Sequence, residues 1–175
     1  MGQGDAIYLR GPTGDTYFID GGSSDVQQVG KYILEPFLKS QGTGSLDYVF
    51  ITHGDKDHYS GIAELLERQN MGVKIKNLVV ACNYKADDEL LSLMQRAKEK
   101  NVHVFVMHQD AFLEEKGLRI VCVQPGKKEQ SLKDNAGSMV LDITYGNFSM
   151  LCAGDVEGLG EETLIKKIQK RKTLK

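Results

Sequence analysis

Cysteine is scarce in this sequence, with three copies among 175 residues. The three are odd in number and widely spaced, and no two have the C-x-x-C spacing of a structural zinc site, so neither a disulfide framework nor a cysteine zinc site is indicated. Each one lies in or beside an apolar run. We therefore expect buried thiols at Cys82, Cys122 and Cys152.

Long apolar runs and an excess of charge of one sign are also lacking. No stretch of 18 apolar residues and no signal-peptide-like segment occurs, so we expect this piece of chain to be a soluble domain. Because 22 Lys and Arg stand against 24 Asp and Glu, no global basic field is available for non-specific nucleic-acid binding. A nucleic-acid substrate would need a local basic patch.

Length and periodicity indicate one α/β domain. At 175 residues and 41% hydrophobic, the chain can bury one substantial core but not two, so we expect residues 1–175 to form a single domain. The apolar spacing predicts two mixed sheets packed together with helices outside. The expected strands are residues 6–9, 16–19, 48–51, 78–81, 102–107, 111–113, 118–123, 139–145 and 148–153, and the expected helices are 25–38, the segment around Ile62, 89–98 and 160–170, with a break or last turn at Pro36.

The segment HGDKDH at residues 53–58 carries four candidate metal ligands directly after an apolar strand, where folds often place functional side chains. With a spacing of two, His53, Asp55 and Asp57 would share one side of a loop, and His58 would reach across from the other. The alternative is a charged turn in which an aspartate caps a helix. Two histidines flanking two aspartates favour a metal site.

A further carboxylate, Asp155, follows the predicted strand at residues 148–153. Taken alone, this position is more typical of an aspartate that caps a turn. A carboxylate nevertheless has two oxygens and can bridge two cations, as a two-metal site requires. The two remaining histidines, His103 and His108, are interpreted as structural or surface residues, with His108 kept as an outside candidate ligand.

Several motifs occur in a fixed order along nearly the whole chain: GQGDA at residues 2–6, FIDGG at 18–22, HGDKDH at 53–58 followed by Gly61, Asn135-x-x-Ser138, and Gly154-Asp155. Together they resemble the metallo-β-lactamase domain of the ComEC-type competence proteins, a DNA-uptake channel family, and its free-standing relatives. The resemblance implies a four-layer αββα sandwich and a metal-dependent hydrolase site. It also implies a nuclease or phosphodiesterase role in handling DNA, in bacteria.

The same resemblance implies a role for each site residue. His53 and Asp55 would hold one divalent ion, Asp57 and His58 the other, and Asp155 would bridge them. Three further residues would support the site or contact substrate: Asp20 behind the metal loop, and Asn135 and Ser138 where many superfamily members carry another ligand histidine.

Two departures from the family pattern affect these expectations. The chain begins at GQGDA, where the family usually has a preceding strand, and residues 156–175 contain no histidine, where the family has a final histidine-rich motif. Either the second metal site is incomplete or the chain is a fragment of a longer protein, truncated at both ends. We expect a fragment.

The predicted chemistry is metal-dependent hydrolysis. Two ions would make hydroxide available near neutral pH, with Asp57 orienting or sharing the water. Three carboxylates and two histidines suit Mn²⁺ at least as well as Zn²⁺. We expect DNA or another phosphodiester as substrate and a parent protein joined to a membrane channel. Two alternatives stay open: a hydrolase of a small ester, thioester or lactone, and a non-catalytic binding module with an incomplete metal site.

Overall fold

A computed structural model describes residues 2–126, 129 and 131–173 of the protein. The first of its two sheets is one of the two inner layers. Its five strands lie in chain order, with the first pair antiparallel and the others parallel: β1 (Ala6–Arg10), β2 (Thr16–Asp20), β3 (Ser45–Ile51), β4 (Lys74–Ala81) and β5 (His103–Met107). The parallel strands β3 and β4 are apolar and buried at their carboxyl ends, as expected for strands covered on both faces. This sheet is mixed, as predicted.

The second sheet has four strands, also in chain order: β6 (Phe112–Glu115), β7 (Leu118–Gln124), β8 (Val140–Tyr145) and β9 (Phe148–Cys152). Every neighbouring pair in this sheet is antiparallel, because tight turns rather than helical crossovers join β6 to β7 and β8 to β9. The second sheet is therefore purely antiparallel rather than mixed.

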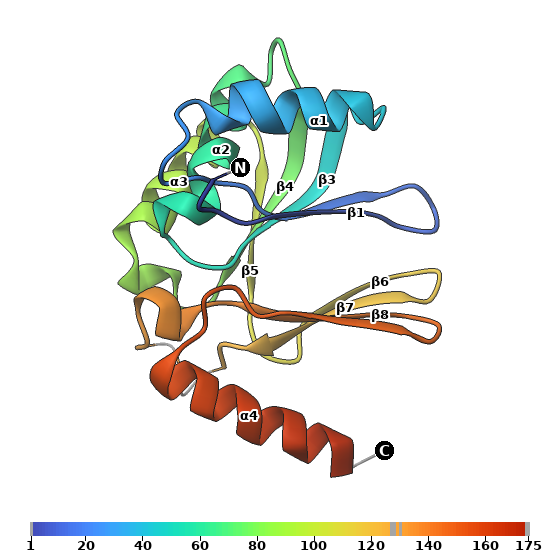
Figure 1. The fold of residues 1–175 in the computed structure, drawn as a ribbon, viewed down its shortest axis with the longest axis vertical. Helices are drawn as coiled ribbons and strands as arrows, with labels where there is room; N and C mark the ends of the chain where they lie inside the picture. The colour runs from blue at the N-terminus through green and yellow to red at the C-terminus, as the bar shows by residue number, and fades with distance from the viewer. Residues whose placement is uncertain (1, 127–128, 130, 174–175) are drawn as a thin grey trace.

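Helices cover the outer faces of both sheets. The chain forms α1 (Glu35–Ser40), α2 (Lys56–Arg68), α3 (Asp88–Glu99) and α4 (Gly158–Thr173), with short turns at η1 (Gly30–Leu34), η2 (Tyr84–Ala86) and η4 (Asp134–Gly137). Figure 1 shows α1, α2 and α3 above the first sheet and α4 below the second. The predicted four-layer αββα sandwich is confirmed.

Three apolar clusters fill the spaces between these layers. Along β3, Val49 and Ile51 face the helices while Phe50 faces the second sheet, because side chains alternate along a strand. A smaller cluster joins the second sheet to α4 through Val140 and Leu164. No helix among the described residues is both long enough and apolar enough to cross a membrane.

Two predicted helix boundaries were wrong. The first helical segment begins at Gly30 with a π-helical turn and continues past Pro36 to Ser40. Pro36 lies in the first turn of α1, where its missing N–H removes little hydrogen bonding, so it does not end the helix. The helix after the HGDKDH segment begins inside it, at Lys56.

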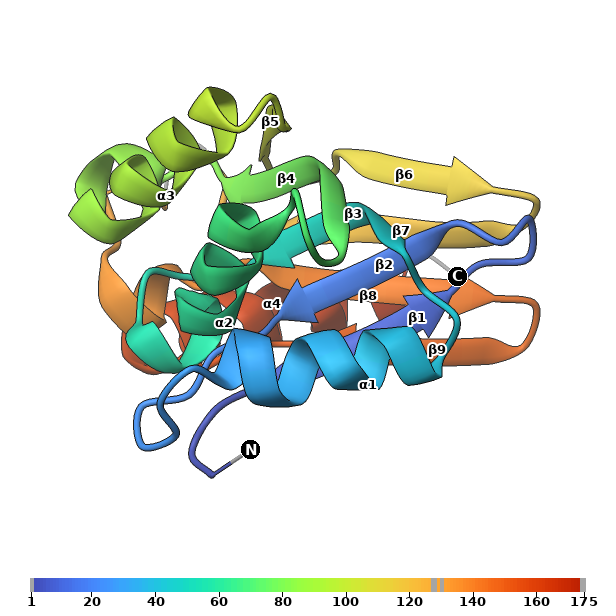
Figure 2. The ribbon, with the colours of Figure 1, turned by 90° about the horizontal axis from the view of Figure 1, so that it is seen from above.

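The strand directions distinguish two ends of the molecule, one with the carboxyl ends of several strands and one with the hairpin turns. Figures 1 and 2 show that β2, β3, β4 and β9 end on the side where α2 begins, whereas the hairpin turns β1–β2, β6–β7 and β8–β9 lie at the opposite end. We refer to these as the strand-end side and the hairpin side. Carboxyl ends of parallel strands are where α/β folds usually place their ligands.

Candidate metal centre

The strand-end side gathers residues from three strands and one helix. β2 ends at Asp20, β3 continues into Thr52 and His53, and Asp155 follows β9. His58 lies in the first turn of α2. Three motifs that are far apart in the sequence, FIDGG, HGDKDH and Gly154-Asp155, therefore meet at one place.

Asp20 is the hub of this arrangement. It is 2% exposed, and its backbone has a φ of 58°, an uncommon conformation for a residue other than glycine. Oδ1 accepts a hydrogen bond from the Thr52 N–H (2.8 Å), and Oδ2 accepts one from the Thr52 hydroxyl (2.9 Å) and lies 3.0 Å from His58 Nδ1. Strained backbone at a site is kept where the surrounding contacts hold it.

These contacts determine the tautomer of both histidines. The Thr52 hydroxyl donates its hydrogen to Asp20, so it must accept from His53 Nδ1, which lies 3.0 Å from Oγ1. His58 Nδ1 donates directly to Asp20. In their neutral forms both rings thus carry hydrogen on Nδ1 and leave the Nε2 lone pair free, the arrangement in which a carboxylate orients a metal-binding histidine.

The free ring nitrogens and Asp155 form a compact donor cluster. Donor atoms of His53, His58 and Asp155 lie within 4.8 Å of one another, and His58 Nε2 is 3.4 Å from Asp155 Oδ2. The two imidazole rings are 4.1 Å apart between centroids. His53 Nε2 is buried and finds no hydrogen-bond partner in the described part of the chain. Because an unpaired buried lone pair is costly, this donor set fits a divalent cation.

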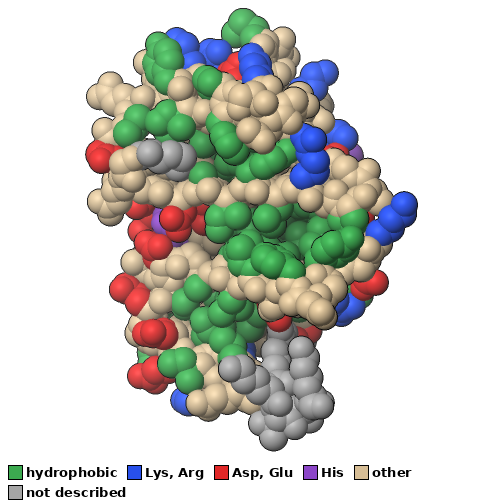
Figure 3. Space-filling model, turned by 45° about the vertical axis from the view of Figure 1, so that its right-hand side comes forward, with side chains coloured by type: hydrophobic (Ala, Val, Ile, Leu, Met, Phe, Trp, Pro, Cys, Tyr) green, Lys and Arg blue, Asp and Glu red, His purple; other side chains and the backbone are tan. Residues whose placement is uncertain are grey.

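The electrostatic surroundings also favour a cation. Burial lowers the pKa of His58, but the hydrogen bond to Asp20 and the charges of Asp20, Asp155 and Asp57 outweigh it and raise the pKa to about 9. Figure 3 shows acidic side chains gathered beside a histidine on the flank between the upper and lower layers. The carboxylates that stabilise a protonated imidazole would also stabilise a metal ion.

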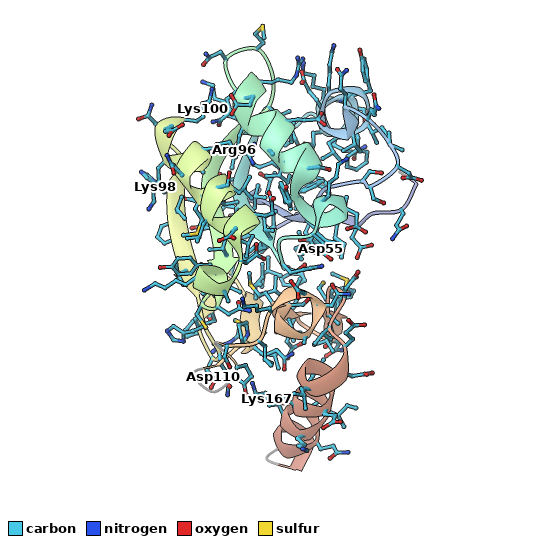
Figure 4. The ribbon with its side chains drawn as sticks, turned by 90° about the vertical axis from the view of Figure 1, so that its left-hand side faces the viewer. Asp55, Arg96, Lys98, Lys100, Asp110 and Lys167 are labelled. Carbon is cyan, nitrogen blue, oxygen red and sulfur yellow. The ribbon has the colours of Figure 1, made fainter. Side chains whose placement is uncertain are left out.

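The two aspartates of HGDKDH lie on either side of the start of α2. Because the chain is helical from Lys56, Asp57 does not continue the extended spacing of His53 and Asp55. Asp55 is exposed at the N-cap position of α2, but its side chain makes no capping hydrogen bond, and its Oδ2 lies 3.5 Å from His53 Nε2. Figure 4 shows Asp55 at the end of α2 that faces the second sheet. Asp57 is half-buried in the first helical turn.

Asp155 lies with both histidines, as the resemblance implied for a carboxylate that bridges two ions. Asp55 lies beside His53, the histidine with which the resemblance grouped it. The assignment of these ligands to two separate ions stays a prediction.

Asn135 and Ser138 lie on the segment before β8, which a hydrogen bond from Met139 N to Thr52 O (2.8 Å) fixes beside the end of β3. Ser138 Oγ and Asn135 Oδ1 are both buried without a hydrogen-bond partner among the described residues.

His103 and His108 are exposed and lie outside the donor cluster. Cys122 and Cys152 are buried as predicted, whereas Cys82 is half-buried.

Two glycines allow these segments to approach closely. A Cβ on Gly22 would lie 2.4 Å from the Lys56 carbonyl oxygen, so the FIDGG motif packs directly against the start of α2. Gly154 has a φ of 53°, and its Cβ would lie 2.9 Å from Thr52 Oγ1. The glycines beside Asp20 and Asp155 thus serve the packing of the site.

Two residues of the site were not predicted from the sequence: Thr52, which links His53 to Asp20, and Asn83. Asn83 follows β4 as His53 follows β3, which is the signal that could have identified it. It is 8% exposed, and its Nδ2 donates to Leu132 O (2.9 Å) and Gly137 O (3.0 Å). A small cavity of about 10 Å³, partly open to solvent, is lined by ten residues: Thr52, His53, Asn83, Ala86, Asp87, Leu90, Leu132, Lys133, Asp134 and Gly137.

Two curated proteins are similar to this chain. ComE operon protein 3 of Bacillus subtilis (strain 168) is 28% identical over 94% of the chain, and competence protein ComA of Neisseria gonorrhoeae is 24% identical over 95% of it. The chain spans only 22% and 20% of the lengths of these two relatives.

The fold and the family agree with this likeness. The metallo-β-lactamase fold protein YhfI from Bacillus subtilis superposes with a TM-score of 0.55 at 14% identity, covering 86% of this chain and 54% of that protein. A family model described as a β-lactamase superfamily domain matches residues 16–171. The resemblance inferred from the motifs is confirmed. The chain belongs to the metallo-β-lactamase superfamily, whose members are generally hydrolases that use divalent metal ions.

Proposed function

We propose that this chain is the hydrolase domain of a DNA-uptake protein and that it cleaves phosphodiester bonds in DNA with two divalent ions. The observation that carries the proposal is the convergence of His53, His58 and Asp155 within 4.8 Å, with both imidazoles oriented through Asp20. The likeness to two competence proteins supports DNA as the substrate.

The proposed ligands are His53, His58 and Asp155, with Asp55 and Asp57 completing the coordination of the two ions. When bound, Mn²⁺ or Zn²⁺ would lower the pKa of water and neutralise charge on the phosphate oxygens. The carboxylates suit Mn²⁺ and the imidazoles suit Zn²⁺. Asn135 and Ser138, which have unpaired buried oxygens, would contact the ions or the substrate.

The chain itself supplies orientation and proton handling. Asp20 and Thr52 hold the two rings in the Nδ1-protonated tautomers, so that the Nε2 atoms stay directed at the cluster. Asp57, half-buried beside the cluster on the first turn of α2, would orient the water and accept its proton.

We further propose that the full-length protein joins this domain to a membrane channel. The support is that the chain spans about a fifth of each competence relative, so a large part of each relative lies outside the matched region. In that arrangement the domain would receive DNA that has reached or is crossing the membrane.

Metal content is the first test. We expect about two equivalents of Mn or Zn by mass spectrometry in the wild-type protein, as a two-metal site requires. His58→Ala should lose them, whereas His108→Ala, which removes an exposed histidine outside the cluster, should retain both. Loss in both variants, or no metal in the wild type, would contradict the proposed site.

Cleavage of single-stranded and duplex DNA with Mn²⁺ or Zn²⁺ then tests the reaction. We expect activity in the wild type and in His108→Ala, and none in His58→Ala. Hydrolysis of a small neutral ester without cleavage of DNA would contradict the proposed substrate while leaving the metal site intact. A metal-loaded protein that cleaves neither would instead be a binding module.

A further inference from the structure

A phosphodiester substrate is anionic, yet the net charge is −2 and the site is surrounded by carboxylates. Positive charge from the protein must therefore be local. Figure 4 shows that Arg96, Lys98 and Lys100 gather at the end of α3 far from Asp55. Helix α3 spans 12 residues, about 18 Å at 1.5 Å per residue, and Arg96 and Lys98 lie in its last turn.

Two of the other basic side chains near the second sheet are already paired. Lys167 on α4 lies 3.3 Å from Glu129, and its side chain is 17% exposed. Arg119 pairs with Glu114 at 2.9 Å, on the hairpin β6–β7. Neither is available to a substrate at the donor cluster.

Lys133 is placed differently. It lines the same cavity as His53, and it is the one Lys or Arg among the ten residues that line that cavity. Its side chain is exposed and forms no ion pair with the described residues. A cation without an ion-pair partner among the described residues, in the lining of the same cavity as His53, is available to an arriving ligand.

The backbone around Lys133 is held in place. Asn83 Nδ2 donates to the carbonyl oxygens of Leu132 and Gly137, which bracket Lys133 in the sequence. A Cβ on Gly137 would lie 2.4 Å from Asn83 Nδ2, so this close contact requires glycine. Anchored at both ends, the segment keeps Lys133 beside the end of β3 at little entropic cost.

We infer that Lys133 is a specificity-determining residue that binds the anionic phosphate group of the substrate beside the metal centre. This inference rests on the proposed function and deepens it, because it assigns the selection of anionic over neutral substrates to one side chain. Two acids line the same cavity. Asp87 accepts a hydrogen bond from Leu90 N (3.0 Å) as the cap of α3, whereas Asp134 is exposed and opposes Lys133.

The adjacent residues Lys133 and Asp134 provide a matched pair for a binding experiment. The probe is a fluorescent phosphorothioate oligothymidine, whose linkages resist hydrolysis, and the readout is fluorescence anisotropy of the metal-loaded protein at several salt concentrations. Lys133→Ala should bind about three- to fivefold more weakly, as expected for one partly screened charge contact. The slope of log K against log salt should fall by about 0.7.

Three further variants separate this contact from general electrostatics. Lys133→Arg should restore binding. Asp134→Asn should strengthen binding because it removes the opposing negative charge, and Asn tolerates the φ of 50° at that position. Lys98→Ala, which removes an exposed charge at the far end of α3, should leave binding unchanged. In a parallel assay Lys133→Ala should raise KM for an anionic phosphodiester and leave a neutral ester unaffected.

The outcomes are distinguishable. Equal weakening by Lys133→Ala and Lys98→Ala, or no binding of the probe by the wild type, would overturn the role of Lys133. If the Lys133 variants change binding as expected but no phosphodiester is cleaved, the anion contact stands and the proposed reaction fails. Cleavage of DNA that is insensitive to Lys133→Ala would leave the reaction standing and remove the specificity role.

Discussion

The two ends of the strand layers both carry acidic residues, but they differ in how fully the buried polar atoms beside those residues are paired. On the hairpin side, Glu115 accepts hydrogen bonds from the Thr13 N–H and the Tyr17 hydroxyl, both at 2.6 Å. Asp47 accepts one from the Thr16 N–H (2.8 Å) and pairs with Lys76 at 2.6 Å. Both of these carboxylates are matched by donors from the protein.

On the strand-end side, several buried polar atoms lack a hydrogen bond. Asp20 is fully hydrogen-bonded, but four other atoms are buried without a hydrogen-bond partner among the described residues: His53 Nε2, Asn83 Oδ1, Asn135 Oδ1 and Ser138 Oγ. Buried polar atoms are rarely left unpaired. The difference teaches that carboxylates alone do not indicate a site, whereas unpaired buried lone pairs beside them do.

The largest expected effect is the loss of metal affinity on substitution of Asp20. Asp20→Asn keeps the shape and suits the φ of 58°, but an amide cannot accept from all the donors that now meet the carboxylate. We expect metal affinity to fall about 10- to 100-fold, as for other residues that orient metal-binding histidines. Isothermal titration with Mn²⁺ or Zn²⁺ measures it.

The matched control is Asp47→Asn on the hairpin side. It also removes a hydrogen-bonded carboxylate, and it should leave metal affinity within twofold of the wild type, about the limit of such a measurement. Equal losses in both variants would mean that net charge, rather than orientation of the imidazoles, governs metal binding.

A second prediction concerns close packing. Gly22→Ala would place a Cβ 2.4 Å from the Lys56 carbonyl oxygen, and we expect a loss of about 1–3 kcal/mol in the free energy of unfolding, as for other overpacked positions. Gly44, just before β3 begins, has open space where its Cβ would lie. Gly44→Ala should therefore unfold within about 0.5 kcal/mol of the wild type in urea. If Gly22→Ala proves equally harmless, the two segments do not depend on this contact.

The sequence predicted most of the strands because their apolar runs are bounded by turn residues. The hairpin at β1–β2 and the buried strand β3 both lie within a few residues of their predicted bounds. The sheet order and the second sheet's direction could not be derived from local pattern, since they depend on which strands pair. The start of α2 was misplaced because HGDKDH has no apolar periodicity, although its backbone is helical from Lys56.

The candidate site was predictable in composition but not in geometry. Motif resemblance pointed to His53, His58, Asp155 and Asp20, and the structure brings these four together. Thr52 and Asn83 were missed because a threonine or asparagine after a strand is common, and only their hydrogen bonds distinguish them.

The smallest expected effect is the contribution of Asp47, on the hairpin side, to stability against acid. Burial raises the pKa of Asp47, but hydrogen bonds from Lys76 and Thr16 outweigh it and hold the pKa below its usual 3.8. The stability that Asp47 contributes is therefore present above pH 3.8 and is lost as the pH falls through the lowered value. We expect about 1 kcal/mol, seen as a smaller loss of the urea midpoint on acidification in Asp47→Asn than in the wild type.

Asp15, at the same end, provides a control of opposite sign. Burial, with the charges of Glu115 and Asp47, raises its pKa, so its contribution is present below pH 3.8 and is lost as the pH rises through the raised value. Asp15→Asn should therefore make the midpoint fall more steeply on acidification than in the wild type, and Asp47→Asn less steeply. Slopes that change in the same direction would show that net charge, rather than the local pairing of each carboxylate, governs the acid stability of the hairpin side.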